Sequence, residues 1–199
     1  MDFKSKSSKQ EDRALKMCPE DSRSVSELVQ CFKAGSRPKY VFFWGHTKSR
    51  GEVNQSCLSQ WYSSPFVKDG MLFPTAEHFM MYSKAILFND EEAASRILSA
   101  ASPGAAKALG RGVQNFTQDV WISKRFEIVV EASYLKFSQN PEIGEYLRST
   151  TKRVLVEASP KDKIWGIGLS RDANGADDPC HWKGLNLLGF ALMEARSSL

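Results

Sequence analysis

The sequence predicts an α+β fold that is predominantly helical, with one small antiparallel sheet. From residue 91 onwards, apolar residues recur mostly at helical spacing. Aromatic and β-branched residues cluster at 40–44 and 154–158, which is typical of short strands. Asp69-Gly70 lies between apolar residues and predicts a tight hairpin turn. At 199 residues with 42% hydrophobic content, the chain is long enough for one domain with a full core.

The N-terminal end carries most of the net charge of +4. Residues 1–40 contain nine Lys and Arg against six Asp and Glu, so the remainder is nearly neutral. Residues 1–22 combine charge and Ser with few large apolar side chains, which disfavours a packed core. We therefore expect a disordered, basic extension over 1–38, with a short helix at 23–33, and a single domain over 39–199.

Tyr40 to Trp44 predicts a buried strand, and a hairpin follows with strands near 66–67 and 71–73. Further helices are expected over 91–100, from Pro103 to Leu109, and over 119–137, 141–149 and 186–196, with Gly110 as the stop of the second of these. In the 119–137 helix we assign Val120 to the core and Arg125 to the solvent. Residues 159–169 form a glycine-rich loop.

The stretch from Phe73 to Lys84 is the most informative one. Pro74 and Thr75 are typical of a helix start, with Thr75 as the N-cap, so Glu77 falls in the first turn. The helix N-terminus favours its ionised form by roughly 0.3–1 kcal/mol. Lys84 follows seven residues later on the same stripe, about 10 Å along the axis. This pair suits a ligand with a cationic transition state at one end and a phosphate at the other, although Glu77 could instead only stabilise the helix start.

The composition argues against a metal-binding protein and against a membrane protein. The four cysteines form no C-x-x-C pair and lack zinc-site spacing with the three histidines, so we expect reduced thiols and no metal site. No apolar run reaches the roughly 18 residues that span a bilayer, and no secretory leader is visible. These features predict a cytoplasmic protein without a membrane partner, the nucleus being left open.

No dinucleotide fingerprint, G-x-S-x-G elbow or Walker loop occurs in the sequence. The remaining candidates for catalysis and binding are polar residues accompanied by tryptophans. Trp61, Trp165 and Trp182 fall in predicted loops and suit stacking on a flat ring, although packing alone could also explain each of them.

These segments resemble the YbiA-like N-glycosidases of the NADAR superfamily in order and approximate spacing, over about residues 40–197. The resemblance is carried by Tyr40 to Trp44, Leu58-Ser59-Gln60-Trp61, Phe73 to His78, Lys84, Gly110-Arg111, Trp121, Asp162 to Gly166, Gly184 to Gly189 and Leu192 to Arg196. Gln60 departs from the Asn that the family often has, and the segment between Gly168 and Lys183 is longer than in short bacterial members. Both departures concern the identity of the substrate.

The resemblance implies a mostly helical domain that acts on ribose-phosphate compounds. Some members hydrolyse early riboflavin-pathway intermediates, and others remove ADP-ribose from guanine in nucleic acid. It further implies Glu77, Trp121 and Asp162 as catalytic residues. The implied substrate-binding residues are Lys84 and Arg111, for phosphate, with Trp61, Trp165, Gly166 and Lys183. Neither a metal nor an organic cofactor is required.

The expected reaction is hydrolysis of a C1′–N bond. Glu77 would stabilise the oxocarbenium ion or deprotonate water, Asp162 would orient water or ribose hydroxyls, and Trp121 or Trp165 would stack on the base. Phosphorylated riboflavin-biosynthesis intermediates are the first candidate substrates and ADP-ribosylguanine in nucleic acid the second. A non-catalytic module that binds ADP-ribose is the third alternative. Simpler roles also stand: Lys84 as a solvated charge, Arg111 as a partner of helix C-terminal carbonyls, and Asp162 as a turn residue.

Overall fold

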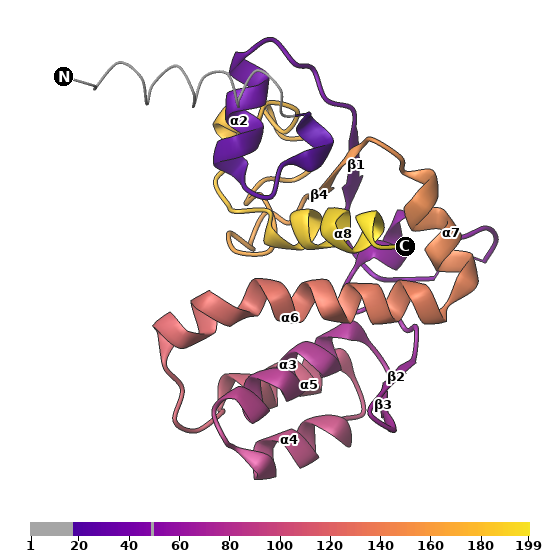
Figure 1. The fold of residues 1–199 in the computed structure, drawn as a ribbon, viewed down its shortest axis with the longest axis vertical. Helices are drawn as coiled ribbons and strands as arrows, with labels where there is room; N and C mark the ends of the chain where they lie inside the picture. Colours follow the sequence, from indigo (N-terminus) through magenta and orange to yellow (C-terminus); the bar gives the residue numbers. More distant parts are fainter. Residues whose placement is uncertain (1–17, 49) are drawn as a thin grey trace. The chain divides into compact units, whose positions relative to one another are not determined.

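The computed structural model describes residues 18–48 and 50–199 (Figure 1). The chain forms two compact units. The first unit contains the described residues up to 43 together with 150–194, and the second contains 44–149 and 195–199. Most regular structure is helical, and two small two-stranded sheets accompany it. The predicted helical α+β class is confirmed, but a parallel strand pair accompanies the one antiparallel sheet that was predicted.

The first unit is built around a parallel strand pair. Its elements are η1 (Pro19–Asp21), α2 (Val25–Lys33), β1 (Tyr40–Phe43), β4 (Val154–Glu157), η3 (Pro179–His181) and residues 187–194 of α8 (Leu187–Ser197). Tyr40 lies opposite Val154 and Phe43 opposite Glu157. Both strands are confirmed, but Trp44 is 66% exposed, so the prediction of a buried strand reaching Trp44 is wrong at its last residue.

The segment before β1 contributes buried side chains to this unit. Ser24 caps α2 by accepting a hydrogen bond from the backbone N–H of Glu27, and Leu28 and Cys31 are buried. Arg23 forms an ion pair with Glu194 of α8. The extension predicted over 1–38 therefore contains an ordered helix at its C-terminal end. Residues 1–17 of that extension lie outside the described residues.

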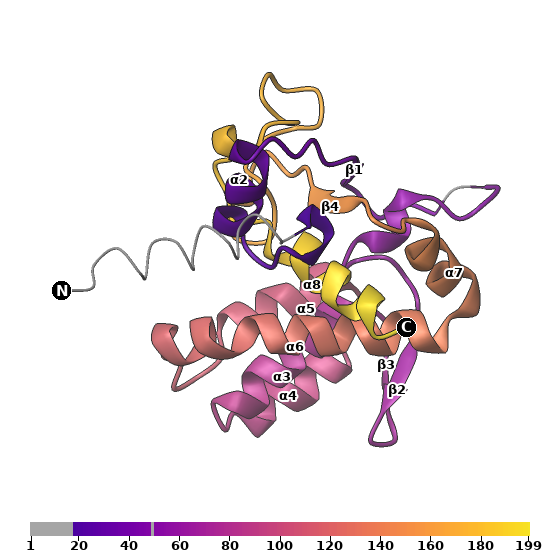
Figure 2. The ribbon, with the colours of Figure 1, turned by 45° about the horizontal axis from the view of Figure 1, so that its top comes forward.

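The second unit consists mainly of helices. Its elements are η2 (Gln55–Leu58), β2 (Phe66–Lys68), β3 (Met71–Phe73), α3 (Ala76–Leu87), α4 (Glu91–Leu98), α5 (Pro103–Arg111), α6 (Gln118–Gln139) and α7 (Pro141–Ser149). In Figure 1, α3, α4 and α5 lie on one side of the long helix α6, and Figure 2 shows α3 beside α4. Helix α3 contacts α4, α5 and α6, which places it at the centre of this group.

The predicted hairpin is confirmed. Asp69 and Gly70 have φ of 50° and 77°, the left-handed conformation that a two-residue hairpin turn requires. The hairpin directs Phe66 and Phe73 into a buried cluster, where Phe79 of α3 lies 5.0 Å from Phe73 between ring centroids. This cluster anchors the chain immediately before α3 begins.

Two features of α5 and α6 differ from the prediction. Helix α5 continues to Arg111, so Gly110 lies inside the helix and is not its stop. In α6, Val120 is 41% exposed whereas Arg125 is only 8% exposed, which reverses their assignment. The reason is periodicity: Arg125 shares a stripe with Val129, Ala132 and Lys136 at spacings of three and four residues, and this stripe is buried despite its charges.

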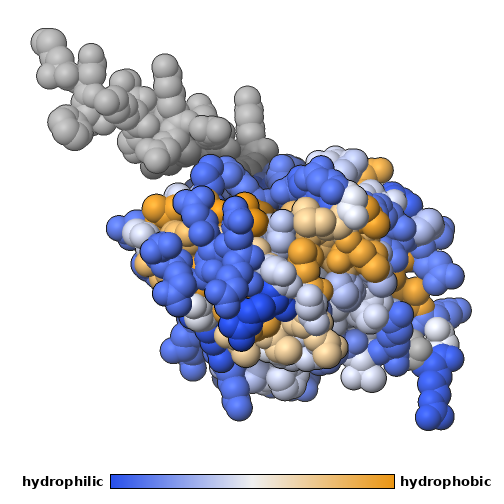
Figure 3. All heavy atoms as spheres, turned by 90° about the horizontal axis from the view of Figure 1, so that it is seen from below, coloured by the Kyte–Doolittle hydropathy of each residue, from blue (hydrophilic) through white to orange (hydrophobic). Residues whose placement is uncertain are grey.

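Apolar side chains lie in separate patches on one face of the protein. On the face drawn in Figure 3, these patches lie among hydrophilic residues. Within residues 18–48 and 50–199, no helix combines the length and apolar character needed to cross a membrane.

Candidate active site

Helix α3 begins at a tightly bonded N-cap. The Thr75 hydroxyl accepts from the backbone N–H of His78 at 3.4 Å and donates to His78 Nδ1 at 2.8 Å. The other ring nitrogen, Nε2, donates to the carbonyl oxygen of Ala100 at 3.0 Å. The cap predicted at Thr75 is confirmed, and His78 has a structural role that the sequence analysis did not assign.

Glu77 lies in the first turn of α3 and is 2% exposed. Its backbone N–H donates to the carbonyl oxygen of Gln60 at 3.1 Å. The field of the helix N-terminus favours the anion of a carboxyl group at this position, whereas burial disfavours it. The structure thus places a buried carboxyl group at the start of α3, next to the segment that contains Gln60 and Trp61.

Lys84 reaches from α3 to the C-terminal end of α5. Its ammonium group donates to the carbonyl oxygen of Gly110 at 2.7 Å. It also lies 4.3 Å from the ring centroid of Phe116 and 5.8 Å from that of Trp121. Burial lowers the pKa of Lys84. Two predicted residues, Lys84 and Trp121, are therefore close together, and Arg111 follows directly after the carbonyl that Lys84 binds.

Gly110 allows this arrangement by permitting α5 to approach α3. A Cβ atom at Gly110 would lie 2.2 Å from Met81 Sδ, so a larger residue would push the helices apart. Met81 follows Glu77 by one turn of α3. The end of α5 that bears Arg111 is thus held against the stripe that contains Glu77 and Lys84.

Trp61 lies against the first half of α5. The edge of its ring is 3.5 Å from where a Cβ of Gly104 would stand. The ammonium group of Lys107 is 5.8 Å from the Trp61 ring, and the His46 ring is 5.4 Å away between centroids. Gln60, which precedes Trp61, is 7% exposed. The half-buried indole of Trp61 and the helix start that bears Glu77 thus belong to the same unit.

The remaining predicted residues form a second group, in the first unit. Asp162 Oδ1 accepts from the backbone N–H groups of Ile164 and Trp165, both at 2.8 Å. Asp162 therefore has the turn role that was the alternative to catalysis.

Gly166 and Lys183 belong to the same loop structure. A Cβ at Gly166 would come within 2.8 Å of the Glu157 carbonyl oxygen, and the backbone N–H of Lys183 donates to the Ile167 carbonyl at 2.9 Å. Asn186 closes the arrangement, since its side chain bonds the backbone of both Leu155 and Glu157. The D-x-x-W-G loop and the start of α8 are thus joined by backbone pairing.

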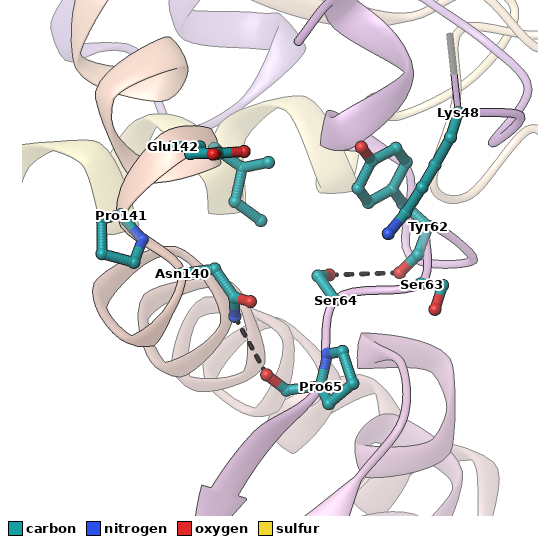
Figure 4. A pocket seen from close by; sticks show the side chains of 9 residues that line it. Lys48, Tyr62, Ser63, Ser64, Pro65, Asn140, Pro141 and Glu142 are labelled. Atoms are coloured by element: carbon teal, nitrogen blue, oxygen red, sulfur yellow. Dashed lines mark hydrogen bonds between the residues drawn. The ribbon is translucent and has the colours of Figure 1, made fainter. Parts of the chain in front are cut away.

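A solvent-open cavity of about 480 Å³ lies elsewhere in the second unit. Figure 4 shows Lys48 and Tyr62 on one side of it and Asn140 and Glu142 on the other. The predicted site residues are not among its described lining residues.

Sequence reasoning missed residues that support the site. Phe116 lies beneath the Lys84 ammonium, and no local pattern marks it, because its partner is 32 residues away. Lys136 is 1% exposed on α6. Its spacing of four and seven residues from Ala132 and Val129 would have placed it on the buried stripe, but its charge argued against that assignment.

The comparisons with known proteins agree on one family. Residues 42–199 match the NADAR domain. N-glycosidase R617 of Acanthamoeba polyphaga mimivirus is 41% identical over 163 residues, which are 79% of this chain and 95% of the viral protein. N-glycosidase YbiA of Escherichia coli K12 is 33% identical over 135 residues, 68% of this chain and 76% of YbiA.

The fold and a plant relative agree with these matches. The NMR structure of the E. coli protein YbiA superposes with a TM-score of 0.65 at 27% identity, covering 82% of this chain and 86% of YbiA. The riboflavin biosynthesis protein PYRR of maize chloroplasts is 33% identical over 138 residues, 66% of this chain but 20% of PYRR. The chain therefore belongs to the NADAR domain family and is homologous to N-glycosidases of the YbiA type.

Proposed function

We propose that this protein hydrolyses the C1′–N bond of a ribose-phosphate compound, with phosphorylated intermediates of riboflavin biosynthesis as its substrates. The observation that carries the proposal is the placement of a buried carboxyl group, Glu77, and a partly buried ammonium group, Lys84, on one helix. Seven residues of α-helix separate them by about 10 Å along the axis. This separation suits a ribose C1′ at one end and a 5′-phosphate at the other.

The chemistry at the Glu77 end follows from the charge that develops on the sugar. As the C1′–N bond breaks, the ribose acquires oxocarbenium character, and an adjacent carboxylate stabilises that cation or takes a proton from the attacking water. Water supplies the new C1′–O bond, and its proton balances the charge on the departing nitrogen. The helix N-terminus favours the ionised form of a carboxyl group in the first turn of α3, and either role requires that form.

Phosphate binding at the other end uses the cations near the end of α5. Lys84 provides a compact ammonium group, and Arg111 provides a guanidinium group that can bind phosphate through two parallel hydrogen bonds. Binding energy from the phosphate would orient the reacting bond at Glu77. Trp121 and Trp61 supply flat apolar surfaces in the same unit on which a base can stack.

Asp162, Trp165, Gly166 and Lys183 stay predictions as site residues. The bonds of Asp162 to Ile164 and Trp165 account for its position without a catalytic role. We nevertheless include Asp162 in the proposal as a group that orients water or ribose hydroxyls, because a carboxylate with one oxygen engaged in a turn retains a second oxygen.

A second candidate function is removal of ADP-ribose from guanine in nucleic acid, by the same bond cleavage. One observation favours it: a groove of about 440 Å³ in the first unit is lined by Arg37, Lys39, Lys152 and Arg153, with Glu20 as the accompanying acid. Such a surface suits a phosphodiester backbone, whose binding weakens steeply with salt. Removal of residues 1–17 with the groove left intact tests whether the basic N-terminal segment also contributes.

The experiment compares base release from two substrates, the phosphorylated ribosylaminopyrimidine and an oligonucleotide that contains ADP-ribosylated guanine. Each is incubated with wild type, Glu77→Gln and Glu91→Gln, the last being a control carboxylate in the first turn of α4. We expect wild type and Glu91→Gln to release base from the pyrimidine compound and Glu77→Gln to lose at least about 10³-fold in kcat. Release from the oligonucleotide alone would replace the first substrate by the second. Release from neither, with ADP-ribose binding still detected by calorimetry, would replace the enzyme by a binding module.

A further inference from the structure

Lys136 is a buried cation whose hydrogen bonds go to the backbone. It lies on α6, is 1% exposed, and donates to the carbonyl oxygens of Cys57 at 2.6 Å and Ser59 at 2.8 Å. Among the described residues, no carboxylate lies within ion-pair distance of its ammonium group. A fully buried Lys without an acidic partner is costly, so its location requires an explanation.

The surroundings of Lys136 favour an N–H donor at this position. Two ring faces lie near its Nζ atom, with centroids at 4.9 Å for Phe137 and 5.7 Å for Tyr62. Tyr62 also lines the cavity drawn in Figure 4. Burial lowers the pKa of Lys136 to about 7. Both the ammonium and the neutral amine carry enough hydrogens to serve the two carbonyls.

The two acceptors lie at the end of η2, where a short helix leaves its last carbonyls without partners in the helix itself. Cys57 and Leu58 are buried, whereas Ser59 is partly exposed, so the Cys57 carbonyl depends most on a donor from the protein. The Lys136 side chain crosses from α6 to satisfy the turn. Removing its donors would leave the buried Cys57 carbonyl without this hydrogen bond and the Ser59 carbonyl with the backbone N–H of Tyr62 at 3.2 Å, which favours rearrangement of the segment.

This segment leads directly into the candidate active site. Gln60 follows Ser59, and its carbonyl oxygen accepts the backbone N–H of Glu77 at 3.1 Å. Trp61 comes next, and its backbone N–H donates to the Ser59 hydroxyl at 3.2 Å. Ser59, whose carbonyl accepts from Lys136, therefore also hydrogen-bonds the backbone of Trp61. It directly precedes Gln60, whose carbonyl accepts from the first turn of α3.

We infer that Lys136 is a positioning residue of the active site: by bonding the Cys57 and Ser59 carbonyls, it holds Gln60 and Trp61 in register with Glu77. This inference rests on the proposed function insofar as it names Glu77 and Trp61 as substrate contacts. The register itself is independent of which substrate is bound. It can therefore be measured without any turnover.

The test uses Lys136→Met, which keeps the length and apolar stem but lacks the donors. Its matched control is Leu147→Ala, which removes a fully buried apolar side chain from α7 in the same unit, and leucine has no side-chain donor for the carbonyls of η2. Hydrogen exchange of the Glu77 amide is measured by NMR in full-length wild type and both variants, at a temperature at which all are folded. Lys136→Leu, which also lacks the donors, replaces Lys136→Met if that variant does not fold.

We expect Lys136→Met to speed exchange at Glu77 at least tenfold relative to Leu147→Ala, once global stability is subtracted. In the base-release assay, we expect kcat/KM to fall by about 10- to 100-fold in Lys136→Met, with kcat and KM both affected, and to change less than about threefold in Leu147→Ala. Equal protection of the Glu77 amide in the two variants would overturn the inference. If wild type releases no base, the proposed function fails, and the exchange comparison still decides the role of Lys136.

Discussion

The ammonium group of Lys84 donates a hydrogen bond of 2.7 Å to the carbonyl oxygen of Gly110, between α3 and the last turn of α5. A helix C-terminus carries partial negative charge on its carbonyls, so a cation is stabilised there. The bond leaves two further ammonium hydrogens, and a phosphate near Arg111 could accept from them. Lys84 thus combines a structural contact with the binding role proposed for it.

Lys84→Met should weaken binding of phosphorylated substrates more than binding of their dephosphorylated counterparts. The methionine keeps most of the apolar stem but lacks the charge, so KM for the phosphorylated compound should rise about tenfold or more. KM for the dephosphorylated nucleoside should change little. Stability should fall by about 1 kcal/mol or less, because Lys84 is only partly buried.

Lys124→Met provides the control for that comparison. Lys124 is exposed on α6, and within residues 18–48 and 50–199 its only ion pair is with Glu127, three residues away. Steady-state kinetics on both substrates measure the effect. An equal rise of KM for the two substrates in Lys84→Met would contradict a role in phosphate recognition.

Gly110→Ala should destabilise the protein even though alanine favours helix. The new Cβ would meet Met81 Sδ at 2.2 Å and Met81 Cβ at 3.0 Å, so α3 and α5 must separate or Met81 must move. Overpacking of this kind costs typically 1–3 kcal/mol, against a helix-propensity gain of up to about 1 kcal/mol. We expect a net loss of about 1 kcal/mol in the free energy of unfolding, measured by urea denaturation.

Gly104→Ala is the matched substitution in the same helix. Its Cβ would lie 3.5 Å from the Trp61 ring, an ordinary contact, so stability should be unchanged or slightly higher. If the two variants are equally stable, the tight contact between Gly110 and Met81 is not the reason for the glycine.

Some elements could be predicted from the sequence and others could not, and the difference has a physical reason. Thr75 as an N-cap and Asp69-Gly70 as a turn were predictable because the relevant contacts lie within four residues. The parallel pairing of β1 with β4 was not, because it joins Tyr40 to Val154 across most of the chain. Gly110 was predicted as a helix stop for the same reason: its partner, Met81, lies on another helix.

The candidate site shows the same limit. Glu77 and Lys84 were placed on one stripe by helical periodicity, but Phe116 and the Gly110 carbonyl become partners of Lys84 only through tertiary packing. Arg125 was assigned to solvent because of its charge, although its spacing from Val129 indicated the buried face.

Asp162→Asn should separate the turn role of Asp162 from the catalytic one. Asparagine keeps an oxygen that can accept from the N–H groups of Ile164 and Trp165, so the turn should survive with a stability loss below about 1 kcal/mol. If the carboxylate orients water or ribose hydroxyls, kcat should fall at least about tenfold.

Asp162→Ala lacks the acceptor and should lose both stability and activity. Urea denaturation and base release, measured on both variants, distinguish the roles. Full activity in Asp162→Asn would assign Asp162 to the loop alone and remove it from the catalytic set.

The stability of the protein should rise with pH between about 7 and 9 because of Lys136. Burial lowers the pKa of this lysine to about 7 in the folded state, from an ordinary value of 10.5. Between these two values the unfolded chain binds the additional proton, so raising the pH favours the folded state. The contribution is at most about 1.4 kcal/mol per pH unit.

The groups that face Lys136 set the upper end of this window. Burial raises the pKa of the Cys57 thiol to about 12 from 9.0, so above pH 9 the unfolded thiol loses its proton first, which offsets the effect of Lys136 and levels the trend. Burial also raises the pKa of Tyr62, whose ordinary value of 10 already lies above the window. Within the window, Cys57 opposes Lys136 only near pH 9, where the unfolded thiol is about half ionised, so the rise with pH remains.

Lys136→Met should abolish this slope, since methionine does not titrate. Urea denaturation of wild type and Lys136→Met at pH 7, 8 and 9 gives the difference in unfolding free energy, in which groups common to both proteins cancel. We expect the difference to change by about 2 kcal/mol in favour of wild type across the window. A difference that is constant with pH would mean that Lys136 keeps its proton up to pH 9, held by the Cys57 and Ser59 carbonyls and the two ring faces. In that case these contacts outweigh the cost of burying the ammonium group.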